Sequence, residues 1–270
     1  MLKIKNLSKT FNENTVNEVK ALRNVSLTLE KGCFTAIIGT NGSGKSTLLN
    51  AVAGSFMPDK GIISVNEQEI THWQEYKRAR FIGRVFQDPF AGTAADMSIS
   101  ENIVLAMKRG KMRNLSTALN RKSRHGIADR VAMLKMGLED RLDNPIGTLS
   151  GGQRQALTLL MATWLKPDLL LLDEHTAALD PKSAAKISEL TQQLIKEENL
   201  TALMVTHSMQ QAVDLPDRIV MMHKGQIVED FREEDKSRIG VPDLLDTFDR
   251  IQKLELFDRS VAELLEQQYI

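Results

Sequence analysis

The feature that most constrains the fold is an eight-residue glycine-rich segment that fits the pattern G-x-x-x-x-G-K-[ST]. It follows an apolar segment typical of a strand, Thr35–Ile38, and precedes an apolar helical segment that starts at Lys45 and stops at Gly54. Glycine lets the backbone curl so that successive N–H groups point at one anion, and the helix N-terminus adds a partial positive charge. A strand, a loop and a helix in this order predict an α/β core with a phosphate site at the end of the strand.

A loop of this kind is typical of sites that bind a nucleoside triphosphate. Lys45 is placed to reach the β- and γ-phosphates, and the hydroxyl of Ser46 is placed to ligate Mg²⁺. Thr47 is more typical of a helix start than of a ligand, and it lies at the edge of the same site. The predicted nucleotide-binding residues of the loop are Gly39, Thr40, Asn41, Gly42, Ser43, Gly44, Lys45, Ser46 and Thr47.

A second segment supplies carboxylates. Four leucines, Leu169–Leu172, read as a strand buried on both faces, and they end in Asp173 and Glu174. Asp173 then suits the Mg²⁺ shell, and Glu174 suits the attacking water as a general base or positioner. Two acids after a strand also occur in solvated loops and helix caps, but a phosphate loop in the same chain favours the catalytic interpretation.

The third segment is Leu149-Ser150-Gly151-Gly152-Gln153, which precedes a helical stretch. It is either a serine-capped helix start with a glycine turn or a second anion site, because small residues expose N–H groups at a helix N-terminus. One chain then carries two phosphate-binding ends. Neither end is redundant if one nucleotide is held between two copies of the chain.

Taken together, these segments resemble the ATP-binding cassette (ABC) ATPases over roughly residues 1–230. The resemblance rests on their order: the phosphate loop, Gln87, LSGGQ, LLLLDE, Ala178-Leu179-Asp180 and His207. It implies that Gln87 contacts Mg²⁺ and water and relays to a membrane partner. It also implies that Asp180 faces the other subunit of a head-to-tail dimer and that His207 lies near the γ-phosphate. The implied catalytic residues are Glu174, His207 and Gln87, with Ser46, Gln87 and Asp173 at the metal.

Two positions depart from the family pattern. Phe11 falls where the family stacks an aromatic ring, commonly tyrosine, on adenine, so the ring is kept and the hydroxyl is lost; it is otherwise a core residue. His175 follows Glu174 where proline is usual, which can alter the surroundings of the carboxylate. No catalytic role for His175 follows from the sequence.

The expected architecture is an ABC-type P-loop NTPase fold of class α/β, with a RecA-like core and an antiparallel β subdomain. A helical subdomain is expected to be inserted at about 88–165, opened by a capping box at Ser98-Ile99-Ser100-Glu101. The ATPase domain is expected to span 1–230 and a helical extension 231–270. Apolar residues of the extension recur at helical spacing, so it either packs on its own domain or forms a dimer contact or regulatory appendage; they are Leu244, Phe248, Ile251, Leu254, Val261, Leu264 and Leu265.

Composition excludes several classes of protein. The chain has 35 Lys and Arg against 35 Asp and Glu, a net charge of zero, so bulk nucleic acid is not the expected partner. No apolar run reaches the ~18 residues that span a bilayer, and the N-terminus alternates apolar and charged residues rather than forming a secretory signal. Cys33 is the only cysteine, which excludes an internal disulfide, points to the cytosol and suits a small core residue.

The class of ATPase is inferred from the segments around the motifs. The chain has one cassette and no long heptad insertion between Gly39 and Ser150, which favours a transporter over repair or translation ATPases. The sequences of residues 83–89 and 173–182 look like those of a bacterial group of ABC ATPases that drive uptake. Members of that group pair with a permease of the branched-chain amino-acid type and an extracytoplasmic solute-binding protein. We therefore expect the ATPase subunit of an importer of a small organic solute, with an amino acid as one candidate, at the cytoplasmic face of the cell membrane. The ATPase is expected to act as a homodimer or a paired dimer with ATP and Mg²⁺.

Alternatives remain open at this point. They are an exporter or lipid-extraction ATPase, and a soluble ATPase of cofactor assembly or nucleic-acid work. In the family, the segment 88–97 receives a coupling helix of the permease; otherwise it is an ordinary loop. A basic cluster downstream is either a solvated face or a contact for lipid headgroups or the permease; it contains Lys108, Arg109, Lys111, Arg113, Arg121, Lys122 and Arg124.

Overall fold

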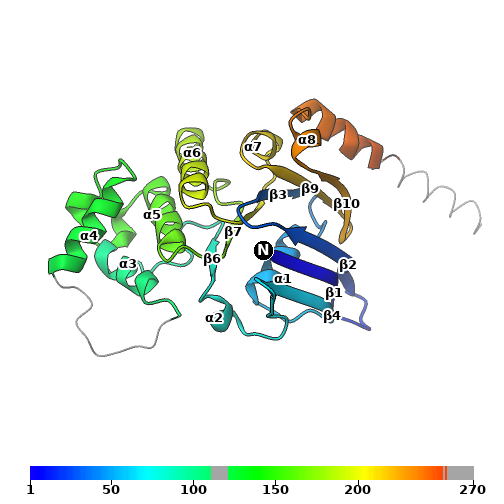
Figure 1. Ribbon diagram of the computed structural model, residues 1–270, viewed down its shortest axis with the longest axis horizontal. Coiled ribbons are helices and arrows are strands. Elements are labelled where there is room, and N and C mark those ends of the chain that lie inside the picture. The colour runs from blue at the N-terminus through cyan, green and yellow to red at the C-terminus, as the bar shows by residue number, and fades with distance from the viewer. Residues whose placement is uncertain (111–120, 252, 254–270) are drawn as a thin grey trace, which may run out of the picture.

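A six-stranded sheet forms the centre of the computed structural model, which describes residues 1–110, 121–251 and 253 (Figure 1). Its strand order is β10-β9-β3-β8-β7-β6, and all neighbours are parallel except the β9–β10 hairpin. The strands are β3 (Phe34–Gly39), β6 (Ile82–Val85), β7 (Leu169–Asp173), β8 (Ala202–Val205), β9 (Arg218–His223) and β10 (Gln226–Phe231). Every residue of β3 and β8 is buried, as expected for central parallel strands covered on both faces.

A second, antiparallel sheet has the order β2-β1-β4-β5. Its strands are β1 (Leu2–Phe11), β2 (Val19–Leu29), β4 (Lys60–Val65) and β5 (Gln68–Glu69). The sequence indicated only the beginning of β1 and the end of β2, because both strands continue into a polar hairpin whose connecting segment, 12–18, is exposed.

Helices lie on both faces of the six-stranded sheet and at one side of it (Figure 1). They are α1 (Lys45–Ala53), α2 (Glu75–Arg78), α3 (Ile99–Met107), α4 (Arg121–Ala132), α5 (Gly151–Thr163), α6 (Pro181–Glu197), α7 (Met209–Asp214) and α8 (Glu233–Lys236), with 3₁₀ turns at η1 (Glu139–Arg141) and η2 (Ile146–Thr148). Residues 241–251 are also helical. The predicted signals are confirmed: Ser98 and Glu101 form a capping box, Asp180 caps α6, and Gly54 ends α1 at φ 88°.

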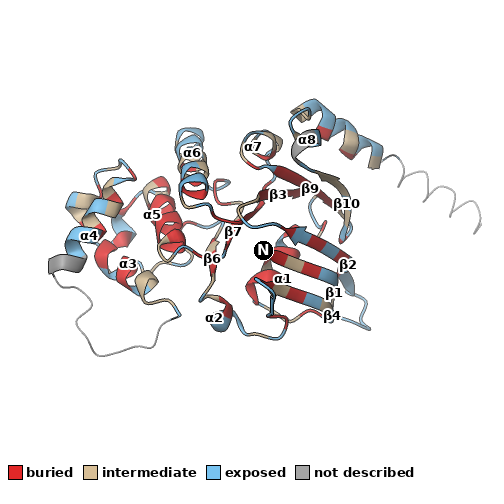
Figure 2. Cartoon of the chain, viewed as in Figure 1, coloured by how far each residue is buried: buried red, intermediate tan, exposed pale blue. Residues whose placement is uncertain are grey.

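Three apolar clusters hold these elements together. Figure 2 shows buried residues of the chain, polar ones included, in red. One joins the antiparallel sheet and α1 to one face of the six-stranded sheet, and the second joins α6, α7 and the segment after β10 to the other face. The third packs α3, α4 and α5 against one another. The predicted α/β fold with a separate antiparallel sheet and a group of helices between β6 and β7 is therefore confirmed.

The segment after β10 packs on its own chain. Leu244 is fully buried and Phe248 is 8% exposed in the second cluster, and Ile251 packs against it. The other apolar residues of the expected extension, Leu254, Val261, Leu264 and Leu265, lie outside the described residues. Among the described residues, no helix is long and apolar enough to cross a membrane.

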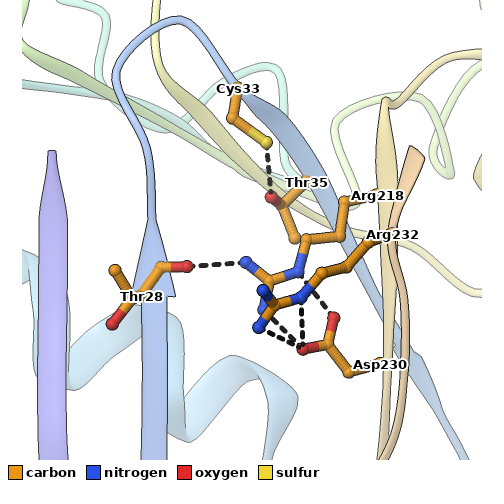
Figure 3. Close-up of polar contacts among 6 residues, drawn as sticks. All are labelled: Thr28, Cys33, Thr35, Arg218, Asp230 and Arg232. Atoms are coloured by element: carbon orange, nitrogen blue, oxygen red, sulfur yellow. Dashed lines mark hydrogen bonds and ion pairs between the residues drawn. The ribbon is translucent and has the colours of Figure 1, made fainter. Parts of the chain in front are cut away.

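Arg218 ties the two sheets to each other (Figure 3). Its Nη1 donates to the carbonyl oxygen of Thr28 on β2 at 2.6 Å, and its Nε and Nη2 each donate to a carboxylate oxygen of Asp230 at 2.6 Å. Burial favours the neutral form of Asp230, but the hydrogen bonds and charge of Arg218 outweigh it and lower the pKa of that carboxyl. Cys33, expected in the core, is only half-buried here, with its Sγ 3.5 Å from Oγ1 of Thr35.

A buried arginine completes the helix that follows the phosphate loop. Arg78 has no exposed surface, and its guanidinium donates to the carbonyl oxygens of Ala51 and Val52 at 2.7 and 2.9 Å. It also donates to the carbonyl oxygens of Thr71 and Trp73, both at 2.8 Å. The last carbonyls of a helix lack partners within the helix, so Arg78 satisfies the end of α1 with side-chain donors. Burial lowers the pKa of Arg78 to about 10, which leaves it cationic at neutral pH.

Replacing Arg78 by Met is expected to lower the free energy of unfolding by about 3–5 kcal/mol, because four buried carbonyls lose their donor. Arg78→Lys should recover part of the loss, since an ammonium cannot reach all four oxygens. Urea denaturation measures both changes. Lys77→Met, at an exposed neighbouring position, is the matched control, and equal stability of the Arg78 and Lys77 variants would contradict the cap.

Candidate functional site

The phosphate loop borders a cavity of about 310 Å³, which is lined by Asn41 to Thr47 and by His207. The loop needs glycine at Gly44, where φ is 98° and a Cβ would lie 2.5 Å from the carbonyl oxygen of Ala21. The sequence thus folds into a tight turn between β3 and α1, with the N-terminus of α1 facing the cavity.

Lys45 lies at the centre of this loop. Its Nζ donates to the carbonyl oxygens of Gly39 at 2.8 Å and Thr40 at 3.0 Å, and the residue is only 4% exposed. Burial lowers the pKa of Lys45, while the charge of Glu174 opposes the shift. These hydrogen bonds hold the buried ammonium against the loop.

Glu174 and His207 meet at the same edge of the sheet. Oε1 of Glu174 lies 2.6 Å from Nε2 of His207. The two residues come from the ends of β7 and β8, which are parallel neighbours, and β8 pairs in turn with β3. Parallel strands bring their carboxyl ends to one edge, so the loop, the carboxylate and the imidazole converge there. A carboxylate hydrogen-bonded to an imidazole beside a phosphate loop can orient and deprotonate a water molecule.

The residues expected at a metal offer oxygen donors only. Ser46 lines the cavity, and the side chain of Asp173 is 16% exposed, with Oδ2 3.4 Å from Nη2 of Arg84. Gln87 is exposed in the segment that follows β6. A hydroxyl, a carboxylate and an amide oxygen are hard ligands of the kind that Mg²⁺ prefers, so the donor set fits this ion. Among the described residues, no group of three or more His, Cys, Asp or Glu is arranged to hold a metal without other ligands.

The segment Leu149–Gln153 forms the start of α5 and does not line the cavity around the phosphate loop. Ser150 caps the helix, and its hydroxyl and the side chain of Gln153 form a reciprocal capping box. A Cβ on Gly152 would lie 2.8 Å from Oγ of Ser183 on α6, so glycine permits this close approach. Asp180, which caps α6 by accepting from the N–H of Ser183 at 3.0 Å, lies next to the same contact. The structure therefore groups the segment with Asp180 and away from the phosphate loop.

Phe11 also lies apart from the residues that line the cavity. Its ring packs edge-on against Phe56 with centroids 5.3 Å apart, and Nζ of Lys9 lies 5.6 Å from its centroid. Phe11 is half-buried, so part of the residue remains accessible.

Sequence reasoning missed the buried polar side chains that join these segments. Gln155 of α5, fully buried, donates from Nε2 to the carbonyl oxygens of Phe86 at 3.0 Å and His175 at 2.7 Å. Gln211 of α7 donates to the hydroxyl of Thr176 at 2.8 Å. No local signal marks Gln155, which follows two other polar residues, Gln153 and Arg154, and sequence alone does not say what such a residue contacts.

The chain is similar to known proteins over most of its length. A profile of the family described as ABC transporter matches residues 22–177. A tyrosine transport ATP-binding protein of Clostridioides difficile is 43% identical over 250 residues, which cover 92% of this chain and 99% of that protein. A probable amino-acid ABC transporter ATP-binding protein of Haemophilus influenzae is 34% identical over 239 residues, covering 85% and 86%.

Solved structures with the same fold include nucleotide complexes. A dimeric ATP-binding cassette in a post-hydrolysis state, bound to ADP and Pi, has a TM-score of 0.72 and 28% identity over 86% of this chain and 99% of that chain. An ATP-binding cassette of an ABC transporter in its ADP conformation has a TM-score of 0.73 and 28% identity, covering 88% and 94%.

The imidazole of His175 is expected to stay neutral down to about pH 4, because burial lowers its pKa from 6.5 to about 4. Between these values the unfolded chain binds a proton that the folded chain excludes, so this residue's contribution to stability falls by about 3 kcal/mol as the pH drops from 6.5 to 4. Nitrogen–proton correlation spectra of the ring follow the titration. The stability difference between wild type and His175→Phe should shrink over the same range, and a midpoint near 6.5 would contradict the assignment.

Proposed function

The chain belongs to the ABC transporter family of ATPases, and on that premise we propose that it is the ATP-hydrolysing subunit of a membrane importer for an amino acid or a related small solute. The observation that carries the proposal is the convergence of the phosphate loop, Glu174 and His207 at one sheet edge, with the capped start of α5 in a separate place. The first group can hydrolyse a bound triphosphate, and the second can complete the site of another subunit.

ATP is proposed to bind with its phosphates in the loop Gly39–Thr47, where Lys45 neutralises the β- and γ-phosphates. Glu174 orients and deprotonates the attacking water, and His207 holds that carboxylate and the γ-phosphate. Mg²⁺, held by Ser46, Asp173 and Gln87, would neutralise phosphate charge. Phe11 would stack on the adenine through the accessible part of its ring.

Two copies are proposed to face each other head to tail. Each ATP is then held between the phosphate loop of one copy and Leu149–Gln153 of the other, with Asp180 at the junction. This arrangement explains why one chain has two anion-binding helix starts that do not share a cavity. Hydrolysis removes the γ-phosphate between the copies, so the dimer loosens and moves whatever is attached to it. The proposed moving parts are the ATPase domain 1–230 with its helical subdomain at about 88–165; residues 231–270 form an extension.

Lys45→Ala is expected to abolish ATP binding, whereas Glu174→Gln is expected to bind ATP with unchanged affinity and to accumulate as a dimer without turning over. The physical reason is that the amide keeps the size of the carboxylate but cannot accept the proton of water. Equilibrium binding of labelled ATP and size-exclusion chromatography with light scattering measure the two effects. A monomeric Glu174→Gln protein at saturating Mg-ATP would contradict the dimer.

A groove beside the segment after β6 is the proposed docking surface for the permease. Its volume is about 350 Å³, and it lies between α2, α3 and α5. Its lining is largely apolar, and Leu105 at its rim is 51% exposed. Tyr76 and Phe90, which belong to neighbouring segments, are 66% and 58% exposed. A concave apolar surface with exposed large side chains around it suits a short helix of a membrane subunit.

One arginine gives this groove a charge preference. Arg109 donates to the carbonyl oxygen of Ala162 at 3.0 Å, but its buried Nε has no partner, and among the described residues no acid pairs with it. The other arginine of the lining, Arg84, is already paired with Asp173 and Glu75. Burial lowers the pKa of Arg109, which shows that its charge is poorly solvated. An acidic side chain on the docking helix would compensate this charge.

Arg109→Glu is expected to weaken association with the permease at least tenfold, because it places like charges opposite each other, and to leave ATP binding by the isolated chain unchanged. Lys196→Glu, on the exposed face of α6 outside the groove, is the matched control. Pull-down from detergent-solubilised membranes with quantitative blotting measures the effect. Equal loss in both variants would indicate a general effect of charge, not the groove.

The direction of transport and the class of solute follow from the relatives. Relatives that cover most of the chain carry names of tyrosine and amino-acid transport systems, and others are methionine import proteins. An importer of this kind is proposed to include a permease and an extracytoplasmic solute-binding protein, with this chain at the cytoplasmic face. The deciding experiment solubilises native membranes under Mg-ATP with Glu174→Gln as bait. Recovery of a polytopic permease with a binding protein that binds an amino acid supports the proposal; recovery of soluble partners or nucleic acid alone refutes it.

A further inference from the structure

The backbone at Glu174 has an unusual conformation. Its φ is 45°, in the left-handed region, where a residue with a Cβ is less stable than glycine, so surrounding contacts must offset the cost. The N–H of Glu174 donates to the carbonyl oxygen of Val205 at 2.9 Å, and its carbonyl oxygen accepts from the N–H of Ala177 at 2.9 Å. These two bonds fix the backbone of Glu174. They do not hold the next residue, whose position sets the direction in which the chain leaves the strand.

His175 is that next residue, and its ring is anchored. The residue is 2% exposed, and Nε2 lies 3.0 Å from Oγ1 of Thr191 on α6. The Thr191 hydroxyl gives its only proton to the carbonyl oxygen of Ile187 at 2.7 Å, so it accepts from His175. The imidazole therefore carries a hydrogen on Nε2 and donates it to a hydroxyl in the middle of α6.

The backbone of His175 is anchored from the opposite side. Its carbonyl oxygen accepts from Nε2 of Gln155 at 2.7 Å, and the second hydrogen of the same amide goes to the carbonyl oxygen of Phe86 at 3.0 Å. Only a donor can face two carbonyl oxygens, which settles the orientation of the amide. One buried side chain of α5 thus links the residue after Glu174 to the residue before Gln87.

We propose that His175 is a positioning residue for ATP hydrolysis: its ring, bonded to Thr191, and its carbonyl, bonded to Gln155, hold Glu174 in the left-handed conformation that keeps its carboxylate beside His207. The inference rests on the proposed role of Glu174 in activating water. The ring of His175 touches neither nucleotide nor water, so its loss acts on the placement of the carboxylate and not on ATP binding. The expected signature is a fall in kcat with little change in the KM for ATP.

The test uses two matched pairs of variants of the full chain. His175→Phe keeps a planar ring without a donor, and His175→Gln restores an N–H at a comparable reach. Thr191→Val keeps the shape without the acceptor, and Thr191→Ser restores the hydroxyl. In steady-state ATPase assays we expect His175→Phe and Thr191→Val to lower kcat at least tenfold with KM changed less than threefold. The two restoring variants should recover kcat to within about threefold of wild type.

The double variant His175→Phe/Thr191→Val tests that one interaction is lost in both. Its kcat should be no lower than that of the worse single variant, because the same hydrogen bond cannot be removed twice. If the factor by which kcat falls in the double variant equals the product of the two single factors, the two residues act independently and the proposed link between them is wrong. A parallel rise in KM or loss of ATP binding would show a general structural defect and would equally overturn the positioning role.

Thermal unfolding and ATP-dependent dimerisation in the Glu174→Gln background show whether each variant folds and binds. If His175→Phe fails to fold, Thr191→Val and Thr191→Ser still test the same hydrogen bond. Wild-type turnover by Glu174→Gln itself would remove the proposed role of the carboxylate. Wild-type kcat in both His175→Phe and Thr191→Val, with Glu174→Gln inactive, would overturn only the positioning role.

Discussion

The structure depends on the hydrogen-bonded register of three parallel strands. β3 pairs with β8 so that Ile37 lies beside Val205, and β8 pairs with β7 so that Val205 lies beside Asp173. The residues that follow each of these positions form the phosphate loop, the segment with His207, and the turn at Glu174. A slip of one residue would move side chains of different size into the same places, and close packing on both faces of β3 and β8 opposes it. Packing of the apolar core thus sets the geometry of the polar site.

Buried polar side chains connect the ends of these strands to the surrounding helices. Gln155 connects α5, at whose start Ser150 lies, to the carbonyls of Phe86 and His175, and His175 connects the turn at Glu174 to α6. Two segments of the site are therefore bonded to the same helix side chain. Breaking these links would leave buried polar groups without a partner, which is costly.

Arginines take a similar part where other elements of the fold end or meet. Arg78 satisfies carbonyls at the end of α1, and Arg218 bonds both to β2 and to Asp230. Arg154 stacks on the ring of Phe90, 4.1 Å from its centroid, with two buried nitrogens unpaired. The guanidinium group suits these places because it offers five donors in a fixed plane and a flat face for aromatic rings.

The sequence by itself determined the fold class, several element boundaries and the candidate residues of the site, because these depend on local signals: Gly44 for a tight turn, Ser98 and Asp180 as caps, and the leucines of β7 as a buried strand. Only the tertiary structure decided the buried links, such as Gln155 to His175, and the separation of Leu149–Gln153 from the phosphate loop. Their partners lie far away along the chain, and no local pattern encodes which buried donor meets which acceptor, since that choice follows from how the apolar faces pack.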